Sequence, residues 1–173
     1  MWTVNCVRFQ TEDLTVKPLT ESDREAVIDL LTDDIVKRFY MVPDFPSREE
    51  AGKLFGRLLE LSHCEDRYVS GIFREGNCIG ILNDTQMIGT SIELGYAILP
   101  AYHNRGYGTQ VLAGAIRYLF DLGFREVLTG AFEENGASIR VMVKCGMTAL
   151  SRREEITYRG RNHNCVYYSK TVG

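Results

Sequence analysis

An apolar strand pattern, a proline, a glycine-rich turn and the start of a helix follow one another over residues 94–109, which read LGYAILPAYHNRGYGT. The apolar run predicts a strand that ends at Pro100, and the periodic apolar residues after Gly108 predict a helix. Gly106 and Gly108 let the backbone turn tightly and approach a ligand closely. The first amides of a helix have no acceptor inside the helix and are suited to bind an anion. This order predicts an α/β unit with a site for a phosphate-bearing cofactor.

Two common phosphate-binding motifs do not fit this turn. The chain contains no G-x-x-x-x-G-K-[ST] loop, and Gly108 is followed by Thr109, Gln110 and Val111, so there is no G-x-G-x-x-G either. These absences argue against a nucleotide triphosphatase or a dinucleotide enzyme, although an unrelated α/β nucleotide-binding protein remains an alternative. The charge of Arg105, the helix dipole and the Thr109 hydroxyl are all suited to a pyrophosphate.

Periodicity elsewhere predicts alternating strands and helices. Two short strands (6–9 and 14–18) precede a helix that starts at the Thr20–Asp23 capping box, a short helix with Ile35, Val36, Phe39 and Tyr40, and a helix capped by Ser47 with a stripe of Leu54, Leu58, Leu59 and Leu61. Next come strands 68–73 and 78–82, a loop at 83–89, strand 92–99, helix 108–122, strand 126–132, helix 135–144, and a hairpin of strands 148–158 and 162–170. We expect a single domain over residues 1–173, of the α/β (α+β) class with a mixed sheet.

Length and charge narrow the classes of protein to which the chain can belong. Its 173 residues suffice for a hydrophobic core, and its net charge of −3 gives no field that attracts nucleic acid or an anionic membrane. No apolar run approaches the roughly 18 residues that span a bilayer. Residues 1–6 lack the basic and apolar segments of a signal peptide. We expect a cytoplasmic protein with no nucleic-acid or membrane partner.

The five cysteines, Cys6, Cys64, Cys78, Cys145 and Cys165, contain no C-x-x-C pair. We expect reduced, mostly buried thiols, as in a cytosolic protein. The pairs His63–Cys64 and His163–Cys165 lack a recognised zinc spacing, so no metal is expected.

Three blocks resemble the GCN5-related N-acetyltransferase (GNAT) superfamily. Residues 103–108 (HNRGYG) resemble the family's pyrophosphate loop [QR]-x-x-G-x-[GA], with His103 in place of Gln or Arg. Residues 135–147 resemble its N-x-x-[AS]-I-x-x-x-x-K-x-G-F helix, with Met147 in place of Phe. Residues 14–23 are similar to the subgroup that acetylates protein N-termini, such as those of ribosomal proteins. The resemblance covers about residues 9–170.

The resemblance implies a mostly antiparallel central sheet flanked by helices, with acetyl-CoA in a cleft where two central strands splay apart. It implies that the pantetheine pairs with backbone at Ala97, Ile98 and Leu99, and that the later helix contributes Asn135 and Ser138. The pyrophosphate loop itself comprises His103, Asn104, Arg105, Gly106, Tyr107, Gly108 and Thr109. For Asn135, a plain helix cap is the alternative role.

The implied reaction is direct acetyl transfer to a primary amine, of a protein N-terminus or a small molecule, through a tetrahedral intermediate. An ammonium must lose a proton before it attacks, so a base or a water relay is required. Glu93, early on the strand that leads to the loop, is the candidate base through water, and a surface carboxylate is the equal alternative. Strand alternation puts Glu93, Gly95 and Ala97 on one face, but a bulge would exchange the faces. A strand amide near Ala97 or Ile98 is the candidate donor to the oxyanion.

The family's usual acid is a tyrosine seven residues after the Asn, and that position is Met142, which cannot donate a proton. Ser138 and Tyr96 are the candidate substitutes, or the thiolate of CoA leaves unassisted, since a thiol pKa near 8.5 makes it a fair leaving group. The missing tyrosine also motivates an alternative function, a non-catalytic acyl-CoA-binding or sensing module on the same fold.

By the same resemblance, residues 39–45 and 159–163 line the acceptor end. Two arginines and a histidine there argue against a polyamine acceptor and could bind a carboxylate or phosphate, with solvated turn charges as the alternative. We expect a monomer or a homodimer.

Overall fold

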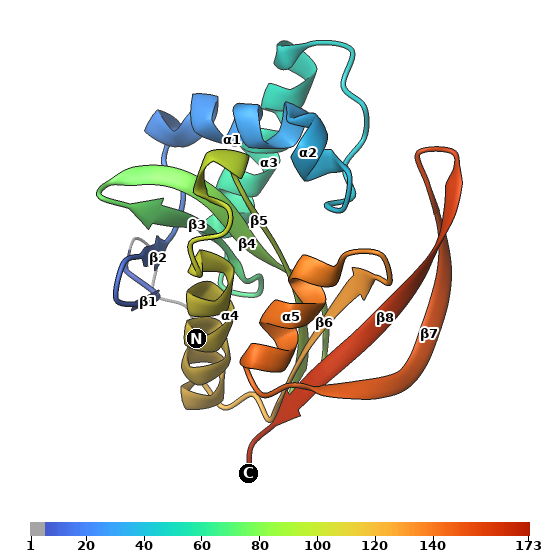
Figure 1. Ribbon diagram of the computed structural model, residues 1–173. Helices are drawn as coiled ribbons and strands as arrows, with labels where there is room; N and C mark the ends of the chain where they lie inside the picture. The colour runs from blue at the N-terminus through green and yellow to red at the C-terminus, as the bar shows by residue number, and fades with distance from the viewer. Residues whose placement is uncertain (1–5) are drawn as a thin grey trace.

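An eight-stranded sheet runs through the molecule in the spatial order β1-β2-β3-β4-β5-β6-β8-β7 (Figure 1). The computed structural model describes residues 6–173. Its strands are β1 (Phe9–Gln10), β2 (Thr15–Lys17), β3 (Val69–Arg74), β4 (Asn77–Ile88), β5 (Ser91–Ile98), β6 (Glu126–Phe132), β7 (Thr148–Tyr158) and β8 (Arg161–Thr171). Neighbouring strands are antiparallel except β5 and β6, which are parallel. The predicted α/β class with a mixed, mostly antiparallel sheet is confirmed.

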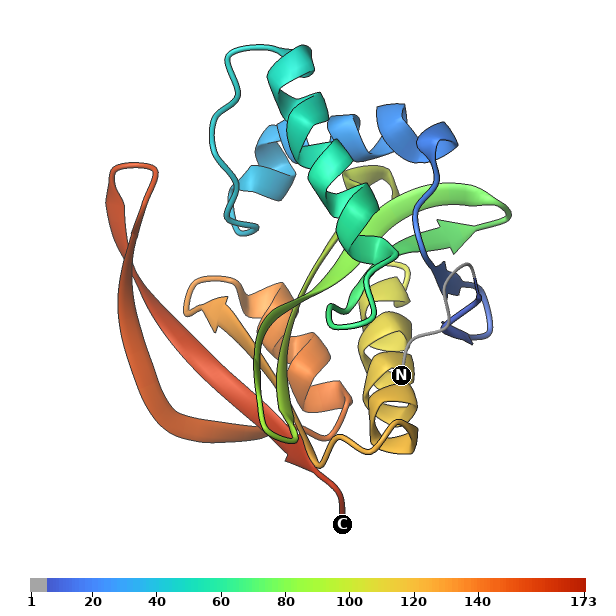
Figure 2. The ribbon, with the colours of Figure 1, turned by 180° about the vertical axis from the view of Figure 1, so that it is seen from behind.

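Helices cover both faces of this sheet, as the two opposite views show (Figures 1 and 2). One face carries α1 (Arg24–Thr32), α2 (Asp34–Lys37) and α3 (Arg48–Ser62), and the other carries α4 (Tyr107–Asp121) and α5 (Gly136–Lys144). Single 3₁₀ turns at Glu21–Asp23 and Pro100–Tyr102 precede α1 and α4. The predicted order of strands and helices is confirmed. Within residues 6–173, no helix has the length and apolar character needed to cross a membrane.

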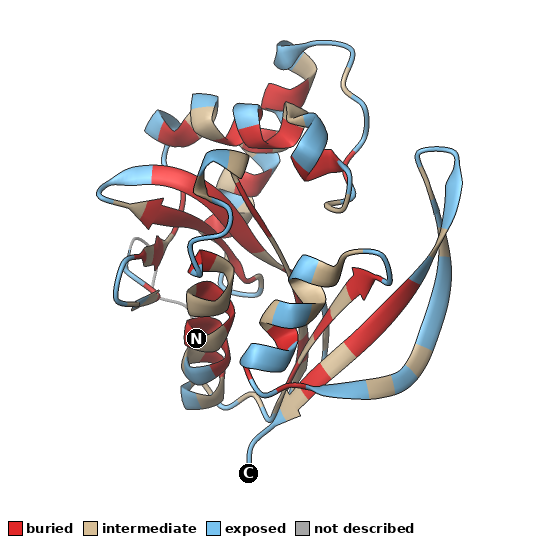
Figure 3. Cartoon of the chain, viewed as in Figure 1, coloured by how far each residue is buried: buried red, intermediate tan, exposed pale blue. Residues whose placement is uncertain are grey.

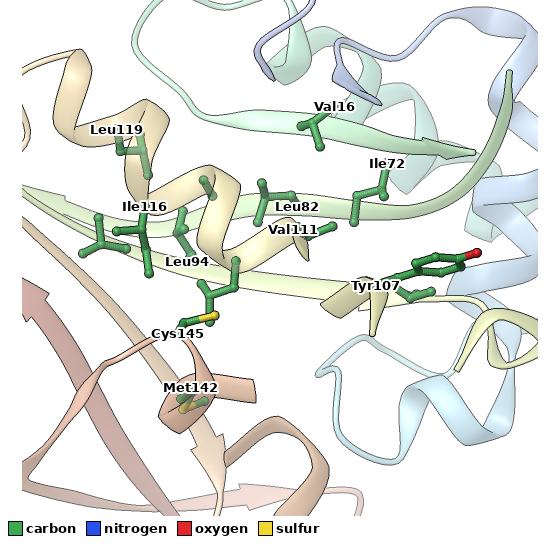
Figure 4. Packing of buried hydrophobic residues seen from close by; sticks show 14 of the residues in the cluster. Val16, Ile72, Leu82, Leu94, Tyr107, Val111, Ile116, Leu119, Met142 and Cys145 are labelled. Atoms are coloured by element: carbon green, nitrogen blue, oxygen red, sulfur yellow. The ribbon is translucent and has the colours of Figure 1, made fainter. Parts of the chain in front are cut away.

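Buried residues lie where the helices face the sheet (Figure 3). On the α4 side, Val111, Ile116 and Leu119 pack in one cluster with Leu82 and Leu94 of the central strands (Figure 4). Each such aliphatic side chain contributes roughly 1.5–3 kcal/mol when it is fully buried. This packing fixes the axis of α4, and with it the position of the helix N-terminus beside β5.

The two parallel strands, β5 and β6, separate halfway along their length. β5 pairs with β6 from Ser91 to Leu94 alone, where Leu94 lies opposite Thr129 and its carbonyl accepts a hydrogen bond of 3.0 Å from the Thr129 hydroxyl. Beyond this point β5 follows β4 to Ile98, whereas β6 follows β8 to Phe132. The expected splay between two central strands is therefore present, and it opens toward the N-terminus of α4.

The predicted loop at residues 83–89 is wrong, because β4 continues through this segment to Ile88. Its polar residues suggest a loop, yet they pair with β5 in a ladder that contains one bulge, between Asp84 and Gln86. Asp84 is buried and accepts hydrogen bonds from the Tyr68 amide at 2.8 Å and from Arg67 Nε at 2.7 Å. A partnered carboxylate thus holds a polar stretch inside the sheet.

Smaller differences concern the N-terminal third of the chain. The first strand is Phe9–Gln10 rather than residues 6–9, and α2 ends at Lys37, before Phe39 and Tyr40. The buried face of α3 is led by Ala51, Phe55 and Leu58, while the other leucines of the predicted stripe, Leu54, Leu59 and Leu61, are partly exposed. Of the segment judged to lack a signal peptide, residues 1–5 lie outside the described residues.

Candidate active site

A cavity of about 730 Å³ occupies the splay between β5 and β6. Its walls come from β5, from the turn before α4, from the first turns of α5, from β6 and β8, and from the segment around α2. This volume lies in the range of small-molecule sites, which favour such junctions between elements. Of the candidate catalytic and cofactor-binding residues, Leu99 and Arg105 do not border the cavity and all the others do, including Glu93, Tyr96 and Ser138.

The N-terminus of α4 forms one end of the cavity. Gly106 has a left-handed φ of 78° and precedes Tyr107, the first residue of the helix. No side chain caps the helix, and its first turn contains no acidic residue. A Cβ built on Gly106 meets nothing within 4 Å, so the backbone is open on that side. The free amides at Gly108 and Thr109 and the helix dipole therefore provide a cradle for an anion.

His103, which stands where the related motif has Gln or Arg, closes the turn by its side chain. Its Nε2 lies 2.7 Å from the carbonyl oxygen of Ile98, so the imidazole links the end of β5 to the start of the loop. Arg105 instead points outward, with its guanidinium over the ring of Tyr102 at 5.7 Å. The anion cradle is thus built mainly from backbone groups, and the His103 side chain holds the loop to the end of β5.

Tyr96 of β5 and Ser138 of α5 bring two hydroxyl groups together at the cavity wall. The Tyr96 hydroxyl lies 3.4 Å from that of Ser138, and burial raises the pKa of Tyr96, so the phenol stays protonated at neutral pH. Asn135 caps α5 by accepting a hydrogen bond of 3.2 Å from the Ser138 amide, and it also borders the cavity. Met142 is fully buried in the core between α5 and the sheet.

Glu93 lies on the face of β5 that looks toward the C-terminal hairpin, and its side chain is 15% exposed. Its Oε1 accepts a hydrogen bond of 3.1 Å from the Thr85 hydroxyl, and its Oε2 lies 3.2 Å from Arg152 Nη1. Sequence reasoning missed both partners, because each lies in an irregular strand segment that periodicity does not place.

The acceptor end is built differently from the expectation. Phe39, Tyr40 and Met41 border the cavity as expected, but the hairpin contributes Ile156, Cys165 and Tyr167 rather than its tip at 159–163. The tip residues have other partners: Arg159 pairs with Asp44 at 3.5 Å, and His163 stacks on Phe132 with ring centroids 4.2 Å apart and bonds to Glu134. The positive charges expected at the acceptor end thus lie outside the cavity.

One further polar contact lies at this end. The Tyr40 hydroxyl donates a hydrogen bond of 2.9 Å to Asn83 Oδ1, which joins the segment after α2 to β4. All five cysteines are free, and Cys78, Cys145 and Cys165 are buried, which agrees with the expected thiols. Across residues 6–173, no group of three or more His, Cys, Asp or Glu side chains is arranged to hold a metal ion.

Comparisons with known proteins converge on one family. A family model described as an acetyltransferase (GNAT) domain matches residues 13–148. The chain is 26% identical over 150 residues to the uncharacterized N-acetyltransferase YoaA of Bacillus subtilis, which covers 80% of this chain and 81% of that protein. It is 27% identical over 144 residues to YnaD of the same organism, with 82% of each chain covered.

Solved structures of this kind share the fold. The ribosomal L7/L12 α-N-protein acetyltransferase RimL in complex with coenzyme A superposes with a TM-score of 0.85 at 17% identity, covering 96% of this chain and 98% of that one. The spermidine N-acetyltransferase from Vibrio cholerae, in complex with CoA and spermine, gives a TM-score of 0.78 at 18% identity, with 92% and 95% covered.

Proposed function

Since the chain belongs to the GNAT acetyltransferase family, whose domain model matches residues 13–148, we propose that it transfers the acetyl group of acetyl-CoA to a primary amine. The observation that carries this proposal is the continuity of the cavity. It runs from the uncapped N-terminus of α4, through the gap between β5 and β6, to Glu93 and the segment after α2. One end suits a pyrophosphate, and the other suits an amine.

The chain's residues fit acetyl-CoA, which supplies the acetyl group as a thioester. The backbone at residues 103–109 would hold the pyrophosphate, with His103 bracing the loop, and Thr109 adds a hydroxyl. The strand edge at Ala97 and Ile98 is free of β6 and would pair with the amides of the pantetheine. Asn135 and Ser138 would contact the cosubstrate from α5.

In the proposed chemistry, Glu93 takes a proton from the acceptor ammonium through a water molecule. The freed nitrogen lone pair attacks the thioester carbonyl carbon, and a backbone amide near Ala97 or Ile98 donates to the resulting oxyanion. The carbon–sulfur bond then breaks, and the Tyr96 hydroxyl, beside Ser138, gives its proton to the sulfur. The nitrogen, which is positively charged after the attack, loses its second proton to water as the carbon–sulfur bond breaks. Glu93 then releases its proton to solvent and Tyr96 takes one back, so the net products are the acetylated amine, CoA thiol and one proton.

The acceptor is proposed at the level of its class, the amine of a protein N-terminus or of a small molecule. Ile35 and Met41, both large and exposed, border the acceptor end, which supports an acceptor with an apolar portion. The five free thiols support a reducing compartment such as the cytoplasm. The second candidate function, an acyl-CoA-binding module without catalysis, is favoured by one observation: Met142, at the usual tyrosine position, is buried in the core.

A test combines binding and turnover. Acetyl-CoA affinity is measured by calorimetry, and CoA thiol release is followed with 2-phenylethylamine, a peptide with a free N-terminus, and spermine. We expect release of thiol that depends on at least one amine, with the acetylated amine identified by mass. Tight binding without thiol release from any amine would favour the binding module. Stabilisation by ATP or NAD but not by CoA would contradict both functions.

A further inference from the structure

A bulge in β4 directs one side chain onto Glu93. Asp84 pairs with Leu94 and Gln86 pairs with Glu93, which leaves Thr85 as an extra residue in the ladder. The Thr85 hydroxyl donates to Glu93 Oε1 at 3.1 Å. Bulges re-aim side chains and occur often beside active sites, so this irregularity orients one oxygen of the carboxylate.

A second irregularity, in β7, brings Arg152 to the other oxygen. Ala149 pairs with Tyr168 and Arg153 with Val166, so residues 150–152 lie opposite Tyr167 alone. This larger bulge carries Arg152 across the hairpin until its Nη1 lies 3.2 Å from Glu93 Oε2. Bulges on two different strands therefore converge on one carboxylate at the cavity wall.

Arg152 is itself held in place by Glu154 and Tyr167. Its Nε and Nη2 donate to Glu154 Oε1 at 3.1 and 2.8 Å, and its guanidinium lies 3.7 Å from the centroid of the Tyr167 ring. The Tyr167 hydroxyl in turn donates to Glu154 Oε2 at 2.8 Å. The hydrogen bond to Glu154 is the largest cause that raises the pKa of Arg152 above its ordinary value. A planar guanidinium fixed along one edge presents its remaining nitrogen in a defined direction.

We propose that Arg152 is a positioning residue, which holds the Glu93 carboxylate turned toward the acceptor amine. The inference rests on the proposed function, in which Glu93 receives the acceptor's proton. Arg152 does not border the cavity, so it acts through Glu93 rather than on the substrate.

The groups around Glu93 give the expected effect of losing Arg152. β7 contributes Arg152 and Glu154, and β8 contributes Cys165, which lies within electrostatic reach of Glu93. Among the described partners of the Glu93 carboxylate, Arg152 is the cation, and it contacts Oε2 while Thr85 contacts Oε1. Without Arg152, Oε2 would lose this partner, and the carboxylate would no longer be held in one orientation.

The experiment compares Arg152→Gln, Arg152→Lys and the control Arg48→Gln. Arg48 also bridges two carboxylates, Glu25 and Asp29, but on the α1–α3 side of the molecule. The acceptor probe is 2-phenylethylamine, whose ammonium, like that of lysine, does not titrate below about pH 9. Turnover is recorded from about pH 5.5 to about pH 9, and acetyl-CoA affinity is measured by calorimetry.

We expect R152Q to lower kcat about tenfold across this pH range, with little change in the KM for the amine. R152K should recover part of the loss in kcat, R48Q should show no loss, and acetyl-CoA affinity should stay the same in all variants. If R152K recovers none of the lost rate, or if R48Q lowers kcat as R152Q does, the positioning role is wrong.

A double-mutant cycle separates this inference from the proposed function. If Arg152 acts through Glu93, R152Q lowers kcat less than twofold when Glu93 is already Gln, because the group it positions is gone. The same loss in both backgrounds would overturn the inference while leaving acetyl transfer intact. If the wild-type protein releases no CoA thiol with any amine, the proposed function itself is overturned.

Discussion

The Tyr158 hydroxyl lies 2.6 Å from the carbonyl oxygen of Lys37, although the two residues are 121 positions apart in the sequence. The same hydroxyl accepts a weaker contact of 3.4 Å from the Val42 amide. Tyr158 ends β7, and Lys37 ends α2 (Figure 1). One phenol therefore joins the hairpin to the segment that borders the acceptor end. This contact ties the hairpin to the acceptor end through a side chain that does not border the main cavity.

Replacing Tyr158 by Phe should loosen this contact between the hairpin and the segment after α2. We expect a loss of about 1 kcal/mol in the free energy of unfolding, the usual net value of one hydrogen bond. The KM for the amine should rise several-fold while acetyl-CoA affinity stays constant. Tyr168→Phe is the matched control, because the Tyr168 hydroxyl has no hydrogen-bond partner among the described residues. Equal effects of the two variants on the amine KM would contradict this role of Tyr158.

Gly106→Val tests the anion cradle. Valine at a φ of 78° is strained by about 1–2 kcal/mol, and its side chain enters the space where the pyrophosphate is proposed to lie. Gly123→Val, at the other end of α4, is the control: its φ is 104°, and a Cβ there also meets nothing within 4 Å. Both variants should lose stability in chemical unfolding, but G106V alone should bind acetyl-CoA at least about tenfold more weakly by calorimetry. Wild-type affinity in a folded G106V protein would refute the loop assignment.

Tyr96→Phe tests the proton donor for the thiolate. Because burial raises the pKa of Tyr96, the phenol keeps its proton through the working pH range and can donate it. We expect kcat to fall by roughly ten- to a hundredfold in Y96F and less in Ser138→Ala, with acetyl-CoA affinity unchanged in Y96F. An unchanged kcat in Y96F would mean that the thiolate leaves unassisted and takes its proton from water.

Cys78 makes stability depend on alkaline pH. Burial raises the pKa of this thiol to about 12, whereas an unfolded thiol titrates near 8.5. Between these values the native state keeps a proton that the unfolded chain loses, so stability is complete below about pH 8.5 and falls as the pH rises. Each such group contributes a slope of about 1.4 kcal/mol per pH unit. Urea unfolding between about pH 8.5 and pH 10 should show a shallower slope for Cys78→Ala, and an equal slope would contradict the assignment.

Local patterns predicted the order of elements well, because strand and helix periodicities are set by neighbours in the sequence. The strand, turn and helix around Gly106 illustrate this, since the turn needs a left-handed residue and the helix needs an apolar stripe. The same patterns failed at residues 83–89, where a polar segment is held in the sheet by the buried Asp84 and its partners. Propensity does not reveal such long-range partners.

The surroundings of Glu93 lay beyond sequence reasoning for a related physical reason. Thr85 and Arg152 reach it through bulges, and a bulge has no signature in the period-two pattern. The burial of Met142 could have been found, because its helical spacing from Ile139 and Cys145 places it on the apolar face of α5. The acceptor end depends on how α2 and the hairpin approach each other, which no local pattern encodes.

The parting of β5 and β6 also bears on how the protein avoids sticking to itself. Unpaired strand edges recruit other chains and promote aggregation, so proteins cover, charge or shorten them. Here the two free edges face each other inside the molecule, between α4 and α5 on one side and the hairpin on the other (Figures 1 and 2). Both edges border the cavity rather than the outer rim of the sheet. Their backbone groups thus stay available to a narrow extended ligand, away from β1 and β7, where a foreign strand would add to the sheet.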